Sequence, residues 1–426
     1  MRILLPLALI ATPAAAQDAP DPARLSADVA TLVGFGTRHT ASNTTDPKRG
    51  IGAARRWAAE RLGSIGGACG GCITVANLAR TFTGPRAPGG VEVVDVLGFQ
   101  AGRDPNRIVI VEAHIDSING DVMDAAGNAP GANDNGSGTA LVLEAARILS
   151  REKFDATIVY ALLSGEEQGL WGGTLLADTA KERGWTVSAV LNNDIVGNSI
   201  GGDGTTRADT VRVFSEGIRS AETLDQAQAR RAIGGEDDGP SRALAKTIDS
   251  IAQTASGLDV FVVRRPDRFG RGGDHEPFLK LGYPAIRFSV AAENYRGQHQ
   301  DVRTEGTIAY GDTAEKMDFA YLAKVTALNV ATLRRLASAP AAPQSVTLDG
   351  ALSYDTKVAW TAVPGATGYR IHWRRNDAQD WTDHRDVTGT TATLPIIVDD
   401  HFVGVSALSA SGAESIATFG ERARRR

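Results

Sequence analysis

The apolar positions between residues 91 and 336 alternate between short continuous runs and stretches with helical spacing. Short apolar runs bounded by turn residues predict buried strands, whereas apolar residues three and four positions apart predict helices. We expect strands at 91–100, 107–113, 157–163, 187–194, 211–214, 259–263 and 284–289, and helices at 138–150, 171–183, 241–255 and 313–336. Strands that alternate with helices predict an α/β fold whose mostly parallel central sheet carries helices on both faces.

Three further stretches belong to this unit. Residues 21–65 end in a segment with helical spacing of its apolar positions, which predicts helix ahead of the first strand. Residues 197–210 are rich in glycine and polar residues, and residues 217–240 show weak periodicity, so both are expected to be long surface loops. Loops of this length commonly shape the substrate pocket of an α/β enzyme.

The pattern changes after residue 337. Residues 338–343 contain two prolines and predict a stiff linker. Short strands separated by turn signals then predict a small all-β sandwich over residues 344–420, with strands at 356–361, 368–374, 390–394 and 402–407. The last residues, 421–426, contain four arginines and predict a frayed basic tail.

The predicted sandwich resembles a fibronectin type III module. The resemblance rests on Trp360, the run Gly368-Tyr369-Arg370-Ile371 and the run Gly404-Val405-Ser406-Ala407. We expect this module to contact the preceding domain or a surface ligand.

The N-terminus has the features of a secretory signal peptide. Arg2 is followed by an apolar segment from Ile3 to Thr12 and then by Pro13 and three alanines. One positive charge, a short apolar segment and an Ala-x-Ala cleavage site predict a signal peptide over residues 1–16. We therefore expect a secreted or periplasmic protein.

Cys69 and Cys72 are the only cysteines in the chain. In an oxidising compartment this pair predicts a local disulfide. The same spacing fits half of a zinc site, but no second cysteine pair completes it.

Composition and charge exclude two classes of partner. The formal net charge is -5, with no basic stripe that could follow phosphates, so a nucleic-acid partner is not expected. No apolar run after the N-terminus is long enough to cross a bilayer, so no membrane span is expected. A hydrophobic share of 42% and a charged share of 22% are typical of a soluble globular protein.

Polar side chains follow three of the expected strands at the point where each strand ends. These residues are His114 and Asp116, Glu166 and Glu167, and Asp194. Parallel sheets bind ligands outside the carboxyl ends of their strands, so we expect these side chains in one crevice. So many carboxylates can share a dry pocket only if cations neutralise them. Histidine mixed with carboxylates suits zinc, and two zinc ions bridged by one carboxylate form a common hydrolytic arrangement.

Asp134 is the candidate for the bridging carboxylate. It lies in the glycine-rich segment 131–138, directly before an expected helix. An Asp in this place is often only a helix N-cap, and a glycine-rich loop before a helix can also bind phosphate. The segment contains neither Gly-x-x-x-x-Gly-Lys-Ser/Thr nor Gly-x-Gly-x-x-Gly, the patterns of the common nucleotide-binding loops, so a bound nucleotide is disfavoured.

Five segments, in order, resemble those of the secreted two-zinc aminopeptidases, a family that also contains glutamate carboxypeptidases and glutaminyl cyclases. The matching motifs are His114-x-Asp116, Gly131-x-Asn133-Asp134-Asn135-Gly136-x-Gly138, Gly165-Glu166-Glu167-x-Gly169, Asn193-Asp194-x-Val196-Gly197 and a late histidine. The resemblance covers roughly residues 25–337, within a peptidase domain that we place at 17–337. It implies a zinc-dependent aminopeptidase that acts on a peptide or small protein.

The resemblance also implies a role for each residue. One zinc ion would be held by His114, Asp134 and Asp194, and the other by Asp134, Glu167 and His299. Glu166 would be the general base, and Asp116 would orient His114. His39, in the segment Thr37-Arg38-His39, is expected to be structural.

The adjacent pair Glu166 and Glu167 requires an irregular turn. Neighbouring side chains on a strand point to opposite faces, whereas both glutamates must face the site. Gly165 and Gly169 make such a turn possible. The alternative is a pair of solvated glutamates at the start of the next helix.

His299 is expected as the last ligand, with His275 as the alternative. The order of motifs and the position of His299 after the strand at 284–289 favour it. Gln298 stands where the resembled family usually has tyrosine, so the residue that stabilises the transition-state oxyanion is not assigned.

Three other functions fit parts of the pattern. A glutaminyl cyclase has the same fold but resembles a single-zinc transferase, and its loop usually lacks the Asn-Gly-Ser-Gly run found at 135–138. A carboxypeptidase for acidic peptides needs arginines for the free carboxylate, and the candidates are Arg264, Arg265, Arg268, Arg271 and Arg296. A non-enzymatic binding protein would have a degenerate metal site, whereas every expected ligand type is present here.

Overall fold

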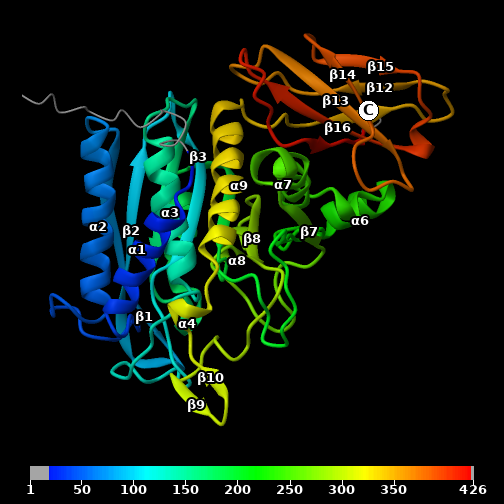
Figure 1. Cartoon of the computed structure of the whole chain (residues 1–426). Helices are drawn as coiled ribbons and strands as arrows, with labels where there is room; N and C mark the ends of the chain where they lie inside the picture. The colour runs from blue at the N-terminus through cyan, green and yellow to red at the C-terminus, as the bar shows by residue number, and fades with distance from the viewer. Residues whose placement is uncertain (1–18, 424–426) are drawn as a thin grey trace, which may run out of the picture.

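The computed structural model describes residues 19–423 (Figure 1). The predicted signal peptide, residues 1–16, lies outside the described residues, as do residues 424–426. The largest sheet has eight strands in the order β1-β2-β4-β3-β5-β8-β6-β7. These strands are β1 (Ile73–Gly84), β2 (Ala87–Gln100), β3 (Asp104–His114), β4 (Ala156–Leu163), β5 (Thr186–Asn193), β6 (Thr210–Phe214), β7 (Asp259–Val263) and β8 (Ala285–Val290).

The middle of this sheet is parallel. Strand β3 pairs in parallel with β4 and β5, and β5 pairs in parallel with β8. Strands β1, β2 and β4 form antiparallel neighbours at one edge, and β6 runs antiparallel to β8 at the other. The predicted mostly parallel α/β sheet is therefore confirmed.

Helices cover both faces of the sheet because alternate residues of its central strands point to opposite sides. On one face, Val109 and Val111 of β3 pack into a core with the helices α1 (Pro22–Gly34), α2 (Ile51–Ala68), α3 (Gly136–Leu149), α7 (Pro240–Ser256) and α9 (Phe319–Ser338). On the other face, Ile108 and Ile110 pack with α5 (Trp171–Glu182) and α8 (Glu276–Lys280).

The structure differs from the predicted elements at two helices. Residues 217–240, expected to be a loop, contain α6 (Leu224–Ile233), which Thr223 and Gln226 cap reciprocally. None of the α6 residues is buried, which explains why the apolar periodicity of this segment is weak. The helix predicted from residue 313 begins only at Phe319, because the side chain of Asp318 caps it by accepting the backbone N–H of Tyr321.

Strand β1 is absent from the sequence prediction because it lies at the sheet edge. Most of its residues are exposed or half-buried, so it has no continuous apolar run. The short hairpin of β9 (Arg303–Glu305) and β10 (Ile308–Tyr310) is likewise too short for a periodic signal.

The C-terminal residues form two four-stranded sheets, in the orders β15-β12-β11-β18 and β14-β13-β16-β17. Their strands are β11 (Thr347–Asp349), β12 (Thr356–Ala359), β13 (Gly368–Arg375), β14 (Asp383–Val387), β15 (Thr391–Leu394), β16 (His401–Leu408), β17 (Thr418–Phe419) and β18 (Glu421–Arg422). Val358 of one sheet and Ile371 and Val405 of the other share a core. The expected small all-β unit is present, but the predicted tail is wrong at its start because β18 pairs with β11.

The α/β unit and the C-terminal sheets are joined by buried polar contacts. Arg374 Nη2 lies 2.5 Å from Asp238 Oδ2, and both side chains are almost fully buried. Arg335 of α9 lies 3.2 Å from Glu414. Figure 1 shows the C-terminal strands beside α6 and α7, at the opposite end of the molecule from β9 and β10.

Two smaller predictions concern α2 and the membrane. Cys69 and Cys72, just after α2, form a disulfide, as the sequence predicts. Within residues 19–423, no helix combines the length and the apolarity needed to cross a bilayer.

Candidate metal centre

The predicted site residues lie at the carboxyl ends of the parallel strands. His114 is the last residue of β3, and Asp194 directly follows β5. Glu166 and Glu167 follow β4 and open the one-turn helix α4 (Glu166–Gly169). The three strands are neighbours in the sheet, so their ends place these side chains in one crevice.

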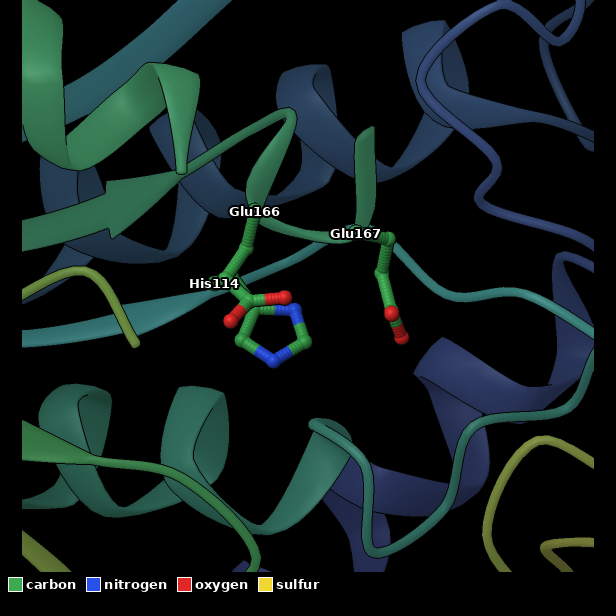
Figure 2. Close-up of side chains that lie close together, drawn as sticks. All are labelled: His114, Glu166 and Glu167. Atoms are coloured by element: carbon green, nitrogen blue, oxygen red, sulfur yellow. The ribbon is translucent and has the colours of Figure 1, made fainter. Parts of the chain in front are cut away.

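The turn around the two glutamates is irregular, as expected. Gly165 before α4 and Leu170 after it both have left-handed backbone conformations, with φ of 81° and 58°. Because Glu166 and Glu167 are in a helical turn rather than a strand, their side chains do not alternate between faces. Figure 2 shows both carboxylates directed toward the space that the imidazole of His114 also faces.

The loop that carries Asp134 is tied to the loop that carries Asp194. The backbone N–H of Gly197 donates to Asn133 Oδ1 at 2.7 Å, and Asn135 Nδ2 donates to the backbone oxygen of Asn193 at 2.8 Å. Asn135 also caps α3, by accepting the backbone N–H of Gly138 at 3.0 Å. The helix cap is therefore Asn135, and the carboxylate of Asp134 is left for the site.

Asp134 lies between two histidines and belongs to two groups of potential ligands. Its Oδ1 lies 3.3 Å from His114 Nε2, and its Oδ2 lies 3.1 Å from His299 Nε2. Asp194 Oδ1 lies 3.7 Å from His114 Nε2, and Glu167 Oε2 lies 3.2 Å from His299 Nε2. Within each group the ligand atoms lie within 4.8 Å of one another. The five residues expected as ligands thus form the two predicted groups of three, which share Asp134.

His299, rather than His275, lies in this cluster. His275 is buried with Nε2 2.8 Å from the backbone oxygen of Pro266 and belongs to none of the ligand groups among residues 19–423. His299 has a φ of 50°, which is uncommon and strained for a residue other than glycine and recurs at functional sites. His39 contacts the backbone oxygen of Val122 at 2.9 Å, in keeping with a structural role.

Asp116 supports the site from behind His114. His114 Nδ1 donates to the backbone oxygen of Asp116 at 3.1 Å and lies 3.6 Å from its carboxylate, so Nε2 is free to face Asp134. The carboxylate of Asp116 accepts Thr40 Oγ1 at 3.1 Å and the backbone N–H of Glu167 at 3.3 Å. Burial acts to raise the pKa of Asp116, but the hydrogen bond from His114 and these contacts lower it below its ordinary value.

The charges in the cluster leave a place for a cation. His114 Nε2, Glu167 Oε1 and Asp194 Oδ1 are buried and have no hydrogen-bond partner among residues 19–423. The charge of Glu167, together with contacts to Asp134, raises the pKa of His299 to about 11 even though burial opposes this. Burial lowers the pKa of His114, but its contacts with Asp116, Asp134 and Asp194 outweigh it and raise that pKa well above its ordinary value. A bound cation would neutralise the same carboxylates, and a mixed set of imidazole and carboxylate donors is one that zinc accepts.

Residues 95–315, more than half of the chain, match the family model described as Peptidase family M28. The chain belongs to peptidase family M28. It is 42% identical over 418 residues to a probable zinc metalloprotease of Pyricularia oryzae, a match that covers 93% of this chain and 82% of that protein.

Solved structures share the fold of this M28 chain. The aminopeptidase of Aneurinibacillus sp. strain AM-1 superposes with a TM-score of 0.53 at 14% identity, over 75% of this chain and 94% of that one. The glutaminyl cyclase of Porphyromonas gingivalis gives a TM-score of 0.51 at 18% identity, over 74% of this chain and 99% of that one. At such identities the likeness shows the α/β fold alone.

Arg287 is a site residue of this M28 chain that the sequence reasoning missed. It lies in β8, is fully buried, and places Nη2 2.9 Å from Asp194 Oδ2 and Nη1 2.8 Å from Asp267. Burial acts to raise the pKa of Asp194, but the Arg287 charge outweighs it and lowers that pKa. Since Oδ2 of Asp194 is held by Arg287, Oδ1 faces His114. The sequence signal was an arginine inside a mostly apolar run, residues 285–290, because an arginine in a buried strand rarely lacks a partner.

Proposed function

We propose that this chain is an aminopeptidase that binds two zinc ions and uses Glu166 as its general base. The carboxylate of Asp134 carries the proposal, because it offers one oxygen to the group around His114 and the other to the group around His299. A shared carboxylate flanked by two histidines is the donor set that a pair of bridged ions requires.

Glu166 is suited to move a proton because neither three-residue set that shares Asp134 includes it. Its carboxylate lies with His114 and Glu167 in a third group whose ligand atoms are within 4.8 Å of one another. When bound, the ions would supply a water with a pKa of about 7 and polarise the carbonyl of the scissile bond. Glu166 would accept the proton of the attacking water and would return it to the amine as the C–N bond breaks.

Contacts of two of the five candidate arginines, Arg264 and Arg271, favour an aminopeptidase over a carboxypeptidase. Arg264 lies 3.2 Å from Asp237, Arg268 lies 3.5 Å from Asp267, and Arg271 donates to Gln298 at 2.9 Å. Arg264 and Arg271 therefore already contact acceptors of the protein, whereas Nη1 of Arg268 is buried without a hydrogen-bond partner among residues 19–423. Two complete sets of ligands also favour a two-ion hydrolase over a glutaminyl cyclase with one zinc ion.

We further propose that the protein is exported and that its substrate is a peptide or small protein. The proposed export rests on the signal pattern of residues 1–16, and the Cys69–Cys72 disulfide supports it because such bonds persist in oxidising compartments. The fibronectin type III-like character of residues 344–420 remains part of the proposal.

The test compares two adjacent substitutions. Glu166→Gln keeps the size of the side chain but removes the base, so kcat on a leucine amide should fall by about 10²- to 10⁴-fold with two zinc ions still bound. Glu167→Gln weakens a direct ligand and should lower the zinc content instead. Zinc content is measured by elemental analysis. Kinetics on aminoacyl amides, on peptides with N-terminal glutamine and on peptides with acidic C-termini distinguish the aminopeptidase from the glutaminyl cyclase and the carboxypeptidase. Normal kcat in Glu166→Gln, or loss of metal there but not in Glu167→Gln, contradicts the assignment.

A further inference from the structure

Asp312 belongs to none of the ligand groups, and yet it holds the backbone of the bridging loop. Its two carboxylate oxygens each accept the N–H of Asn133 at 3.0 Å, and Oδ2 also accepts the N–H of Asp134 at 2.7 Å. Its backbone oxygen accepts the N–H of Ala132 at 3.2 Å. Three consecutive amides, ending at the proposed bridging residue, therefore donate to one buried residue.

The same loop is held from its other end by Arg38. This fully buried side chain donates from Nη1 to the backbone oxygen of Pro130 at 2.6 Å and from Nη2 to that of Gly131 at 2.9 Å. Its Nε donates to the backbone oxygen of Ile115 at 2.7 Å, which ties the loop to the end of β3. A cation thus takes the carbonyls of 130–131, whereas the carboxylate of Asp312 takes the amides of 133 and 134 and its backbone oxygen takes that of 132.

A carboxylate at position 312 carries an electrostatic cost, since burial and the charge of Asp134 both act to raise its pKa. A neutral acceptor would avoid this repulsion, but a carboxylate presents two oxygens to two successive amides at once. Charged acceptors also make stronger hydrogen bonds than neutral ones. The contacts of Asp312 therefore hold the backbone of Asp134 rigidly, although a neutral residue at position 312 would reduce the repulsion between the two side chains.

We propose that Asp312 is a positioning residue that fixes Asp134 for binding of both zinc ions. The inference rests on the proposed function, in which Asp134 bridges the ions. A carboxylate that must serve two ions at once tolerates little displacement, so loss of its backbone anchor should weaken both sites. Residues behind metal ligands typically contribute about 10- to 100-fold in metal affinity.

The experiment measures zinc affinity of the full chain by competition with a chelating dye. Asp312→Ala removes the side-chain acceptors and should weaken zinc binding by about 10- to 100-fold. Asp312→Asn keeps one oxygen, which can accept from Asp134 N–H, and should recover most of that loss. Asp318→Ala is the matched control, because Asp318 also accepts a backbone N–H, that of Tyr321 at 2.9 Å, but touches no proposed ligand. It should lower the melting temperature of the apoprotein and leave zinc affinity unchanged.

Three results overturn the inference. The first is an Asp312→Ala variant that binds zinc as tightly as the unmodified protein. The second is an Asp312→Asn variant whose zinc affinity is as low as that of Asp312→Ala, which would show that charge rather than hydrogen bonding matters. The third is an equal loss in Asp318→Ala, which would indicate general loosening. Because the readout is affinity, a protein that binds two zinc ions but cleaves no aminoacyl amide would reject the proposed aminopeptidase and still test Asp312.

Discussion

Buried carboxylates are neutralised differently in the C-terminal sheets and in the α/β unit. In the C-terminal sheets, Glu414 is 2.8 Å from His372 Nε2 and 3.1 Å from Arg370, and it accepts the hydroxyl of Ser406 at 2.7 Å. Arg335 of α9 adds a further cation at 3.2 Å. This carboxylate is therefore fully supplied with partners by the protein itself.

The cluster at the ends of β3, β4 and β5 is not supplied in this way. Asp134, Glu167 and Asp194 share two histidines and Arg287, and buried oxygens of Glu167 and Asp194 have no hydrogen-bond partner in the described part of the chain. The partners of Glu414 show that a buried carboxylate of this protein can be neutralised by side chains alone. The incomplete cluster therefore indicates a site made for an external cation, and the difference gives four ways to test that interpretation.

The largest effect should come from Asp134→Asn. One substitution removes a ligand from both proposed ions, and the ions supply several kcal/mol of transition-state stabilisation, so activity should fall by at least about 10³-fold. Zinc content should fall toward zero, whereas Glu414→Gln should leave both activity and zinc unchanged. Elemental analysis and kinetics on a leucine amide check this. Retention of one full zinc equivalent in Asp134→Asn would show that the ions do not share it.

The next effect concerns the buried pair between the two units. Arg374→Ala leaves Asp238 with Lys246, which lies 3.0 Å away, and breaking a buried pair costs about 3 to 5 kcal/mol. Urea denaturation should show this loss of stability, with zinc content and kcat/KM unchanged. Asp238 and Thr186, at the amino end of β5, line one pocket, so this pair is remote from the strand ends that carry the site. A variant that loses zinc would place the C-terminal sheets among the determinants of the metal centre.

A third prediction uses pH. Burial acts to raise the pKa of Glu414, but its bonds with His372 and Ser406 outweigh this and lower the pKa from 4.5 to about 2. A folded-state pKa below the unfolded value stabilises the protein above pH 4.5, and this contribution of about 3 kcal/mol is lost as the pH falls toward 2. The difference in unfolding free energy between the unmodified protein and Glu414→Gln should therefore shrink over that interval. A difference that is independent of pH would contradict the shift.

The fourth prediction concerns the stabilisation by zinc. A ligand that binds only the folded state stabilises it by about 2.7 kcal/mol at 100 times its Kd, for each site. Removing zinc with a chelator should lower the melting temperature of the protein, and adding zinc should restore it. Asp134→Asn should show no such shift, which separates the proposed site from adventitious binding elsewhere.

Most of the candidate site could be predicted because a parallel sheet brings the carboxyl ends of its strands together. His114, Glu167 and Asp194 each follow an apolar run, so the run and its final polar residue indicated both the strand and the crevice. The glycine-rich segment before a helix offered Asp134 as the candidate bridge and the resemblance added His299, and the structure places both within the cluster. The metal-binding and catalytic roles of these residues remain predictions for the experiments above.

Helix α6 and strand β1 escaped prediction for a shared reason. Neither buries a continuous face, since α6 has no buried residue and β1 lies at the edge of the sheet. Periodicity reports burial, so an element that is stabilised mainly by caps or by edge hydrogen bonds leaves a weak pattern.

The sequence by itself determined the α/β class, the order of the central strands and helices, and which polar residues end the strands, because these follow from local periodicity and strand polarity. Only the tertiary structure decided which remote groups hold those residues in place. Asp312 meets the amide of Asp134 across 178 positions of sequence, and Arg287 reaches Asp194 from a different strand. Such contacts depend on distances between packed elements, which no local pattern of residues encodes.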